Sequence, residues 1–500
     1  MLHPRRHSPL LLLLPALLAC DPKGIKLGDD SEAHVEPPVP TITVSGGALD
    51  PLLGTECALD VTAANGSTVA LTISDEAGTV LRTLADGSAM VDATAWDGRD
   101  ETGMLQPVGT YLVDAELLDP DGIVLASATA DFYIVRVGVL SGTLGGERIP
   151  LIWHLGSGPG HYWEEAATDS TFEIAALDDG ITATALPALW DDLDVPPASH
   201  VGEGMPAAYP YDAVPSLTLA VAGDFGGAPV HLTVEGWGEA QPVAPGDTPT
   251  FTRGAALATG PSVVEESVTF TWSVGDTAVG AQTLPMRLYA TLGEPGFEQT
   301  DAPYEPWVAA IDPALRAISG VEATDEAVTS ALTEWIYRDA GISYDTRYGA
   351  SYYTSYSGRT YNNALFDFTS FLARRNGTTV NCTDCASILE AYADMLGANL
   401  SYTIILQNFD LNFIKAIGGT DFTHCPFGAS GCSFSYHAVT TPDDTLTIYD
   451  ATLALDGDDA PGAGPFTELL VQHIEGAEYL ERLVMDGTAT YNYTQKEMLR

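Results

Sequence analysis

Residues 379–389 decide the fold of the C-terminal third of this chain, and they read TVNCTDCASIL. The apolar residues that follow recur on one helical face, up to a glycine at 397: Ile388, Leu389, Tyr392 and Leu396. This pattern predicts a buried helix that begins at or just after Cys382. Because the unpaired N–H groups and the macrodipole at a helix N-terminus favour a thiolate, Cys382 is a candidate nucleophile. A buried structural cysteine or one half of a disulfide is the alternative for this residue.

A second element downstream is predicted to be a β-hairpin. Its parts follow in order: FSYHAV at 434–439, TPDD at 441–444 and LTIYD at 446–450. If the turn is centred between Asp443 and Asp444, His437 lies directly opposite Asp450, where a carboxylate can orient an imidazole and stabilise its cation. A turn of odd length would change this register, and a His–Asp pair across a hairpin is also an ordinary surface pair.

Together these elements resemble the transglutaminase-like superfamily of cysteine acyltransferases and proteases. The matching motifs are Cys-x-Asp-x-Ala at 382–386, His-Ala at 437–438 and Asp-Ala-Thr at 450–452, with upstream similarity at 332–336, 342–345 and 371–377. The resemblance implies an α+β, papain-like domain in which a helix presents the nucleophile to a sheet. It also implies a role for each residue of the site: Cys382 is the nucleophile, His437 the general base and acid, and Asp450 the residue that orients the imidazole.

The chain departs from the family pattern after the His-Ala pair, where Val439 stands in place of a frequent aromatic residue. The family also uses a side chain upstream of the cysteine to donate a hydrogen bond to the oxyanion. The sequence offers three candidates and does not choose among them: Tyr361, Asn362 and Asn363. Cys385 is a second thiol at the same helix start.

The N-terminus is typical of an exported protein. Two arginines precede a short apolar run at 10–18, which is too short to span a membrane. The run ends in Leu-Leu-Ala-Cys at 17–20, which resembles a bacterial lipobox. The resemblance implies that the signal peptide 1–19 is removed and that Cys20 carries lipid, so the protein is expected to be a lipid-anchored membrane protein of the bacterial cell envelope. An ordinary secretory signal followed by an accidental cysteine is the alternative.

An exported chain enters an oxidising compartment, so the cysteines other than Cys20 are possible disulfide partners. They are odd in number, which leaves at least one free thiol. Cys425 and Cys432 bracket a short loop, and a local disulfide between them, with Cys382 left reduced, is the simplest prediction. Two alternatives use the same residues: Cys382 and Cys385 as a redox pair, or these two with Cys425 and Cys432 as a zinc site. No metal and no cofactor is predicted.

The rest of the chain is predicted to be rich in β-structure. Residues 20–45 are expected to form a tether without a fold. Residues 46–138 resemble the immunoglobulin-like module of flagellar-hook capping proteins, with matching motifs at 75–78, 80–84, 96–103 and 107–111. Trp96 and Tyr111 are large enough to fill its core. A calcium loop at 97–101 is the alternative to a plain acidic turn there.

The predicted domain order continues with a β-rich region at 139–300, which is expected to form one or two further sandwiches without assigned chemistry. The transglutaminase-like domain is expected at 301–475, followed by a C-terminal extension at 476–500. The predicted fold class is therefore multidomain, with β-sandwich modules followed by an α+β domain.

The composition excludes one class of partner. Twenty basic residues oppose sixty-eight acidic ones, giving a net charge of −48 at pH 7. A field of this sign repels phosphate backbones, so nucleic acid is not an expected partner. The expected activity is cysteine-dependent acyl transfer or hydrolysis on peptide or glutamine amides, with protein or peptide substrates at the cell envelope. A non-catalytic binding or scaffolding lipoprotein that retains the fold is the alternative.

Overall fold

The computed structural model describes the following residues: 39–51, 53, 56–63, 68–87, 93–149, 151–153, 164–165, 171–173, 207–296, 298–299, 308–355, 364–460, 462–495 and 498–499. The predicted signal peptide, Cys20 and most of the tether lie outside them. The three oxyanion candidates Tyr361, Asn362 and Asn363 also lie outside them. None of the helices in this described part of the chain combines the length and apolar character that a membrane span requires.

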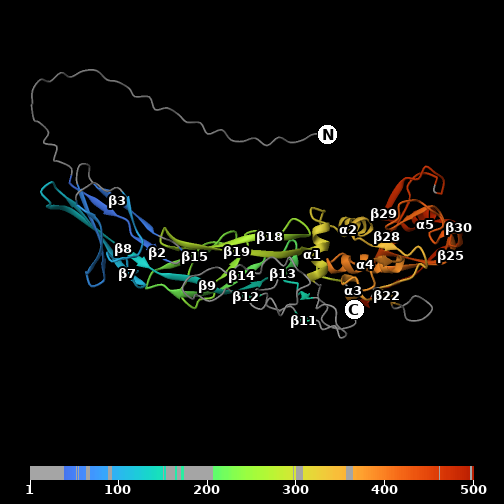
Figure 1. Ribbon diagram of the computed structural model, residues 1–500, viewed down its shortest axis with the longest axis horizontal. Helices are drawn as coiled ribbons and strands as arrows, with labels where there is room; N and C mark the ends of the chain where they lie inside the picture. The colour runs from blue at the N-terminus through green and yellow to red at the C-terminus, as the bar shows by residue number, and fades with distance from the viewer. Residues whose placement is uncertain are drawn as a thin grey trace, which may run out of the picture. The chain divides into compact units, whose positions relative to one another are not determined.

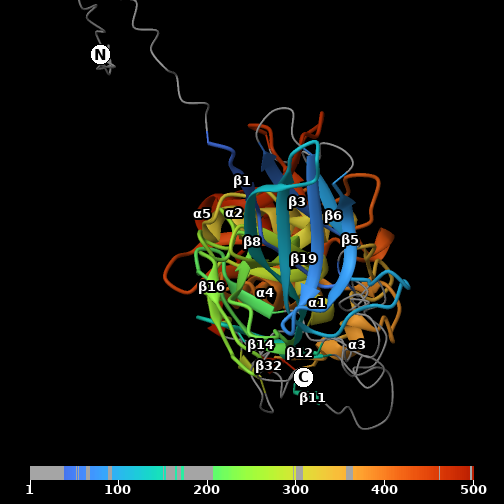
Figure 2. The ribbon, with the colours of Figure 1, turned by 90° about the vertical axis from the view of Figure 1, so that its left-hand side faces the viewer.

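The first module is a β-sandwich of two sheets (Figures 1 and 2). One sheet has three strands: β1 (Ile42–Val44), β3 (Cys57–Ala63) and β6 (Ala93–Trp96). The other has five: β2 (Gly47–Leu49), β4 (Thr68–Asp75), β5 (Val80–Asp86), β7 (Gly109–Leu118) and β8 (Val124–Ile134). Strands β4 and β5 form a hairpin around the Asp-Glu-Ala-Gly turn at 75–78, in which Gly78 takes a φ of 81°.

Alternating burial explains why these strands form a sandwich. In β3 every second residue is buried, so its apolar side chains share one face. Trp96 and Tyr111, one from each sheet, pack edge to face with ring centroids 5.4 Å apart, which confirms their predicted place in the core. In the acidic turn, Asp100 accepts hydrogen bonds from the backbone N–H groups of Thr102 and Met104. This carboxylate therefore closes its own turn.

A second sandwich follows directly. Its first sheet holds β9 (Arg136–Gly145), β12 (Thr171–Glu173), β14 (Ser216–Asp224) and β17 (Thr250–Thr252). Its second sheet holds β13 (Ala207–Pro210), β15 (Val230–Val234), β16 (Gln241–Pro242), β18 (Ser262–Val274) and β19 (Thr277–Thr291). Both sheets contribute to one core, so the described residues of 139–300 form one sandwich. The boundary predicted at 138 falls within β9.

The C-terminal module is built on a seven-stranded sheet. Its strands are β25 (Leu400–Leu411), β26 (Ile414–Ala416), β27 (Ser433–Pro442), β28 (Thr447–Asp456), β29 (Glu468–Glu475), β30 (Val484–Gly487) and β31 (Thr490–Gln495). Helix α2 (Asp325–Asp339) packs on β28 and β29, and α4 (Cys382–Met395) packs on β25, β27 and β28 (Figure 1). The helix predicted to begin at or just after Cys382 is thereby confirmed.

The remaining described elements are short. The helices are α1 (Val308–Ala317), α3 (Phe368–Leu372), α5 (Gly476–Leu483) and a 3-10 turn at Gly428–Ser430. The strands are β10 (Ile152–Trp153), β11 (Glu164–Glu165), β20 (Glu298–Gln299), β21 (Ser343–Tyr344), β22 (Thr354–Ser355), β23 (Leu365–Phe366), β24 (Thr379–Val380) and β32 (Met498–Leu499).

The predicted boundary at 475 cuts through this module. Strands β30 and β31 both pair with β25, and α5 packs on β28, β29 and β30. Residues 476–495 are therefore part of the sheet and its cover. The motifs of this module end at 452, and the strands that complete its sheet carry no motif of their own.

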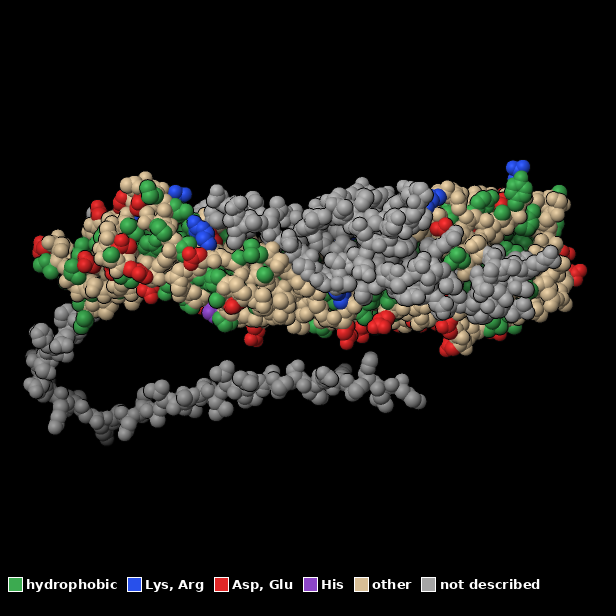
Figure 3. Space-filling model, turned by 90° about the horizontal axis from the view of Figure 1, so that it is seen from below, with side chains coloured by type: hydrophobic (Ala, Val, Ile, Leu, Met, Phe, Trp, Pro, Cys, Tyr) green, Lys and Arg blue, Asp and Glu red, His purple; other side chains and the backbone are tan. Residues whose placement is uncertain are grey.

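The described surface is mainly acidic where it is charged. Figure 3 shows acidic side chains scattered over the visible face, with few basic ones among them. Since surfaces that carry the same charge repel one another, this distribution opposes association between copies of the chain through these faces.

The C-terminus of α4 is held by a neighbouring segment. The backbone N–H groups of Leu292 and Gly293 donate to the carbonyl of Leu396, and that of Gly296 donates to Asp394. Gly397 follows with a φ of 89°, the left-handed conformation that ends many helices. A Cβ at Gly397 would lie 2.6 to 2.7 Å from backbone atoms of Gly293.

We expect Gly397→Ala to destabilise the chain more than Gly377→Ala. Both glycines have positive φ, which costs an L-residue about 1–2 kcal/mol, but a Cβ at Gly377 would meet nothing within 4 Å. Gly397→Ala must also displace the segment that binds the carbonyls of α4. Urea unfolding followed by near-ultraviolet circular dichroism measures both variants. Equal loss of unfolding free energy in the two would show that the contact with Gly293 is unimportant.

Candidate active site

Cys382 is the first residue of α4, as the periodicity predicted. Asn381 caps the helix: its side chain accepts a hydrogen bond from the backbone N–H of Asp384, while the Asp384 carboxylate accepts one from the N–H of Asn381. The thiol belongs to a small apolar cluster with Ala386, Tyr402 and Ala438, and Cys382 is only 3% exposed. The helix start is thus fixed by a reciprocal cap directly beside the thiol.

Asp384 also binds a separate segment to this helix start. Its carboxylate accepts hydrogen bonds from the N–H groups of Tyr352, Tyr353 and Thr354 at 2.8 to 3.0 Å, and from the Ser351 hydroxyl at 2.8 Å. Burial raises the pKa of Asp384, and these donors oppose the increase without cancelling it. The aspartate of the Cys-x-Asp motif therefore positions residues 351–354 against the helix that carries Cys382.

His437 and Asp450 form a buried pair. His437 Nε2 lies 2.9 Å from Asp450 Oδ2, and the two side chains are 0% and 1% exposed. The Asp450 carboxylate also accepts hydrogen bonds from three further donors. Tyr479 donates its hydroxyl to Oδ2 at 2.8 Å, and the N–H groups of Thr452 and Leu453 donate to Oδ1 at 2.7 and 3.3 Å. The Asp450 side chain is held in one orientation by donors from three different elements.

The predicted register of the hairpin was wrong by two residues. Thr440 pairs with Tyr449, whereas a turn centred between Asp443 and Asp444 would have placed Thr447 there. A shift of two residues keeps side chains on the same face, so His437 and Asp450 still meet, as diagonal neighbours. After Asp450 the pairing of β28 with β29 is interrupted until Ala454. Such an irregularity re-aims side chains next to it.

The imidazole of His437 favours its protonated form. Burial lowers the pKa of His437, but the charge and the hydrogen bond of Asp450, with a further effect of Cys382, raise it to about 10. The second ring nitrogen, Nδ1, is buried and makes no hydrogen bond within the residues that the structure describes. His437 therefore has one ring nitrogen, Nε2, bound to Asp450, while the other, Nδ1, is available to Cys382.

The two thiols at this helix start differ in their surroundings. Both Cys382 and Cys385 are free, so the redox bridge between them is not formed. Cys385 is fully buried, and burial together with the nearby charges of Asp384 and Asp450 raises its pKa well above the usual range for a thiol. Cys385 is therefore kept as a neutral thiol and is a poor nucleophile.

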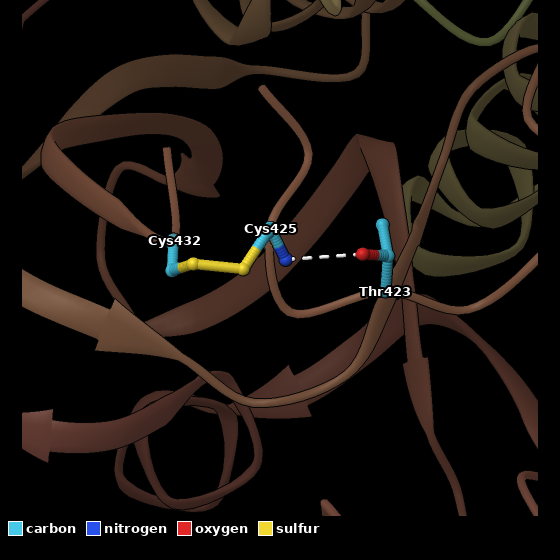
Figure 4. Close-up of a disulfide and its surroundings, with 3 residues drawn as sticks. All are labelled: Thr423, Cys425 and Cys432. Atoms are coloured by element: carbon cyan, nitrogen blue, oxygen red, sulfur yellow. Dashed lines mark hydrogen bonds between the residues drawn. A yellow bond between two sulfur atoms is a disulfide. The ribbon is translucent and has the colours of Figure 1, made fainter. Parts of the chain in front are cut away.

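The predicted disulfide between Cys425 and Cys432 is confirmed (Figure 4). The N–H of Cys425 donates to the Thr423 hydroxyl at 3.0 Å, which anchors one end of the loop. His424, Cys425 and Cys432 have potential metal-ligating atoms close together, but both sulfurs are in the disulfide. The four-cysteine zinc alternative fails for the same reason.

Phe427, in the disulfide loop, packs against His437 through a second aromatic ring, that of Phe434. The ring of Phe427 is 5.7 Å from that of Phe434, and Phe434 stacks on His437 with centroids 5.4 Å apart. The Phe427 ring is held closely by two glycines: a Cβ at Gly349 would approach it to 2.8 Å, and one at Gly431 would also collide with it. This packing supports the imidazole on the side of Phe434.

Sequence reasoning missed Tyr479, Phe427 and Phe434. Tyr479 lies in α5, beyond the last motif, and nothing in its sequence neighbourhood indicates a bond to a distant aspartate. Phe434 precedes His437 by three residues, a spacing that places side chains on opposite faces of a regular strand, so the sequence did not indicate their contact.

No protein-family model and no curated protein matches the sequence. Among solved structures, the chain is similar to the fibronectin(III)-like modules of Clostridium thermocellum CbhA, with 11% identity over 50% of this chain and 94% of that chain, and a TM-score of 0.20. It is also similar to the complex of Dpr11 IG1 with DIP-gamma IG+IG2, with 10% identity over 50% and 99% of the chains and a TM-score of 0.14. A third is Bacteroides ovatus SGBP-B in complex with mixed-linkage heptasaccharide, with 10% identity over 80% and 89% and a TM-score of 0.13. Similarity this weak carries no argument, so the β-sandwich modules rest on their own sheets and cores.

We expect His437 to be protonated at about pH 8, because its pKa is raised above the ordinary value of 6.5 to about 10. The stabilisation of the folded state by this proton is complete below 6.5 and is lost as the pH rises through about 10. Imidazole NMR of the folded chain measures the titration directly.

Two variants sharpen this measurement. Asp450→Asn should lower the pKa of His437 the most, and Cys382→Ala should lower it less, because the carboxylate has the larger effect. A neutral His437 ring in the wild type near pH 8 would contradict the expected charge state of the pair.

Proposed function

We propose that this chain is an exported, lipid-anchored protein whose C-terminal module has the transglutaminase-like fold and catalyses cysteine-dependent acyl transfer or hydrolysis. One observation carries the proposal: the buried bond between His437 Nε2 and Asp450 Oδ2, with Cys382 at the N-terminus of α4 among the groups that act on the same imidazole. A nucleophile, a base and a residue that orients the base are the parts that covalent acyl transfer requires.

The proposed reaction divides into two halves. In the resting pair His437 Nδ1 already holds the proton of Cys382, and Cys382 Sγ attacks the carbonyl carbon of a peptide or glutamine amide as a thiolate. As the C–N bond breaks, His437 returns the proton to the leaving nitrogen, and an acyl thioester remains on Cys382. An amine or water then attacks the thioester and gives a proton to His437, and Cys382 leaves as a thiolate beside the protonated imidazole, which restores the starting pair. The products are a new amide or a carboxylic acid.

Asp450 stabilises the charged form of the base throughout this cycle. It accepts a hydrogen bond from His437 and three others, so its carboxylate is oriented before substrate arrives. Preorganised charge of this kind stabilises the imidazolium that forms when the thiol is deprotonated.

A second candidate is a non-catalytic binding or scaffolding lipoprotein with the same fold. The observation that favours it is burial: Cys382 is 3% exposed and His437 is 0% exposed, so substrate would need a local opening of the described structure. The two candidates differ in whether the thiol can be reached in solution.

Thiol labelling of the folded, non-reduced chain should depend on Cys382. Cys382→Ala should abolish labelling by an electrophilic probe as well as any amine incorporation or amide hydrolysis. His437→Ala should lower the rate of amine incorporation or amide hydrolysis by about 10²–10⁴-fold, since it removes the base. Asp450→Ala should lower that rate by a smaller factor. Combining the substitutions should add little to the loss from Cys382→Ala alone.

Cys385→Ala is the matched control, because this thiol occurs one turn along the same helix and its pKa is raised by burial. It should leave labelling largely intact. Labelling that disappears with Cys385→Ala and persists with Cys382→Ala would identify the other thiol as the nucleophile. If neither thiol reacts in the folded chain, the binding-protein candidate is the correct one.

Lipid attachment at Cys20 is expected from the lipobox resemblance at 17–20. Metabolic labelling with a fatty-acid analogue should tag the wild type and not Cys20→Ser. Cys57→Ala is a suitable control, because Cys57 is a buried free thiol in β3 and should keep the tag. Equal tagging of Cys20→Ser and the wild type would contradict the anchor.

A further inference from the structure

The phenol of Tyr436 lies at the start of α4, beside the candidate nucleophile. Its hydroxyl oxygen is 3.2 Å from Thr383 Oγ1 and 3.4 Å from Asn381 Nδ2, and these two residues flank Cys382 in the chain. Tyr436 also packs against the small apolar cluster to which Cys382 belongs. In the sequence, Tyr436 comes directly before His437 in β27. One strand therefore brings both an imidazole and a phenol to the same thiol.

The amide of Asn381 determines how this phenol is oriented. Its Nδ2 group has two protons: one is donated to the Gly349 carbonyl at 3.1 Å, and the other can be donated to the Tyr436 oxygen. A phenol whose oxygen accepts a hydrogen bond from an amide keeps its own proton for donation. In the resting structure that proton can go to Thr383 Oγ1. The phenol is thus held as a donor at the helix start.

A donor at this position suits the oxyanion of acyl transfer. When the Cys382 thiolate attacks a carbonyl carbon, negative charge develops on the carbonyl oxygen, one bond away from that carbon. Cys382 is the first residue of α4, so its own N–H has no acceptor within the helix and can supply one hydrogen bond. A charged oxygen is also a stronger acceptor than the Thr383 hydroxyl, so the Tyr436 proton should turn to it. Two donors then converge on the oxyanion.

We propose that Tyr436 is a catalytic residue that donates a hydrogen bond to the oxyanion formed at Cys382. This inference rests on the proposed function and names a further residue of the same site. As Sγ bonds to the carbonyl carbon, the π electrons of the C=O bond move to oxygen, and the phenol donates to that oxygen. When the C=O bond re-forms, the leaving group departs with its electron pair, and Tyr436 keeps its proton throughout. Tyr436 follows the cysteine in the sequence, unlike the upstream donor that the family resemblance implies.

A second phenol near the same thiol is less suited to this role. Burial raises the pKa of Tyr344 well above its ordinary range, and the nearby charge of Cys382 adds to the increase. Tyr344 is only 7% exposed, whereas Tyr436 is half-buried. A carbonyl group that arrives from solvent therefore meets the phenol of Tyr436 first. Tyr344 is the matched control for the experiment.

Two small reagents separate the oxyanion from the thiol. p-Nitrophenyl acetate acylates a thiolate through an oxyanion and releases p-nitrophenolate, whereas iodoacetamide alkylates it by direct displacement of iodide, without an oxyanion. Both reagents act on the full mature chain and require no natural substrate. The rate at Cys382 is the rate of the wild type minus that of Cys382→Ala, measured separately with each reagent.

Tyr436→Phe should slow acylation of Cys382 by roughly 10²-fold, because loss of one oxyanion donor costs about 10²–10³ in rate. It should leave the rate of alkylation unchanged, since the thiolate and the imidazole are still in place. Tyr344→Phe should keep the ratio of acylation to alkylation that the wild type has.

Unchanged acylation of Tyr436→Phe, or equal slowing of both reagents, would overturn the inference. So would a Thr383→Val variant that loses acylation as fully as Tyr436→Phe does, because the phenol would then only support the helix start. A wild type in which Cys382 reacts with neither reagent would overturn the proposed reaction as well. Failure of the oxyanion role is thereby distinguished from failure of the proposed function.

Discussion

The buried carboxylate of Asp450 is the constraint on which the C-terminal module depends. An ionised group with almost no solvent contact is costly unless donors surround it. Its donors come from β27 through His437, from α5 through Tyr479, and from the irregular part of β28 itself through Thr452 and Leu453. Each donor depends on a different feature of the module. The position of α5 brings Tyr479 to the carboxylate, the interrupted β28–β29 pairing frees the N–H groups of Thr452 and Leu453, and the ring of His437 donates from β27.

A second buried carboxylate, Asp384, has the corresponding role at the helix. It caps α4 and binds the backbone of residues 352–354, so the segment before the helix cannot move without exposing unsatisfied N–H groups. One aspartate thus fixes the helix that carries the thiol, and the other fixes the imidazole. The relation between Cys382 and His437 is set by two polar networks embedded in an otherwise apolar core.

Local patterns in the sequence predicted much of this module, and tertiary effects account for the rest. Helical periodicity and the closing glycine predicted α4 to within a residue, and the short loop between Cys425 and Cys432 predicted their disulfide. The hairpin was predicted on the correct face but in the wrong register, because the turn is centred between Asp444 and Thr445, one residue later than predicted. The bond of Tyr479 to Asp450 could not be predicted, since it joins residues that are far apart in the chain and have no common motif.

The ring of Phe427, enclosed by Gly349 and Gly431, has a consequence for mutational tolerance. Neither glycine has a side chain, and Gly349 occurs far from the disulfide loop in the sequence. Yet a single methyl group at either position would displace Phe427 and, through Phe434, the ring of His437. In a comprehensive substitution library scored for thiol reactivity, these two positions are therefore as restrictive as a residue that contacts the imidazole directly.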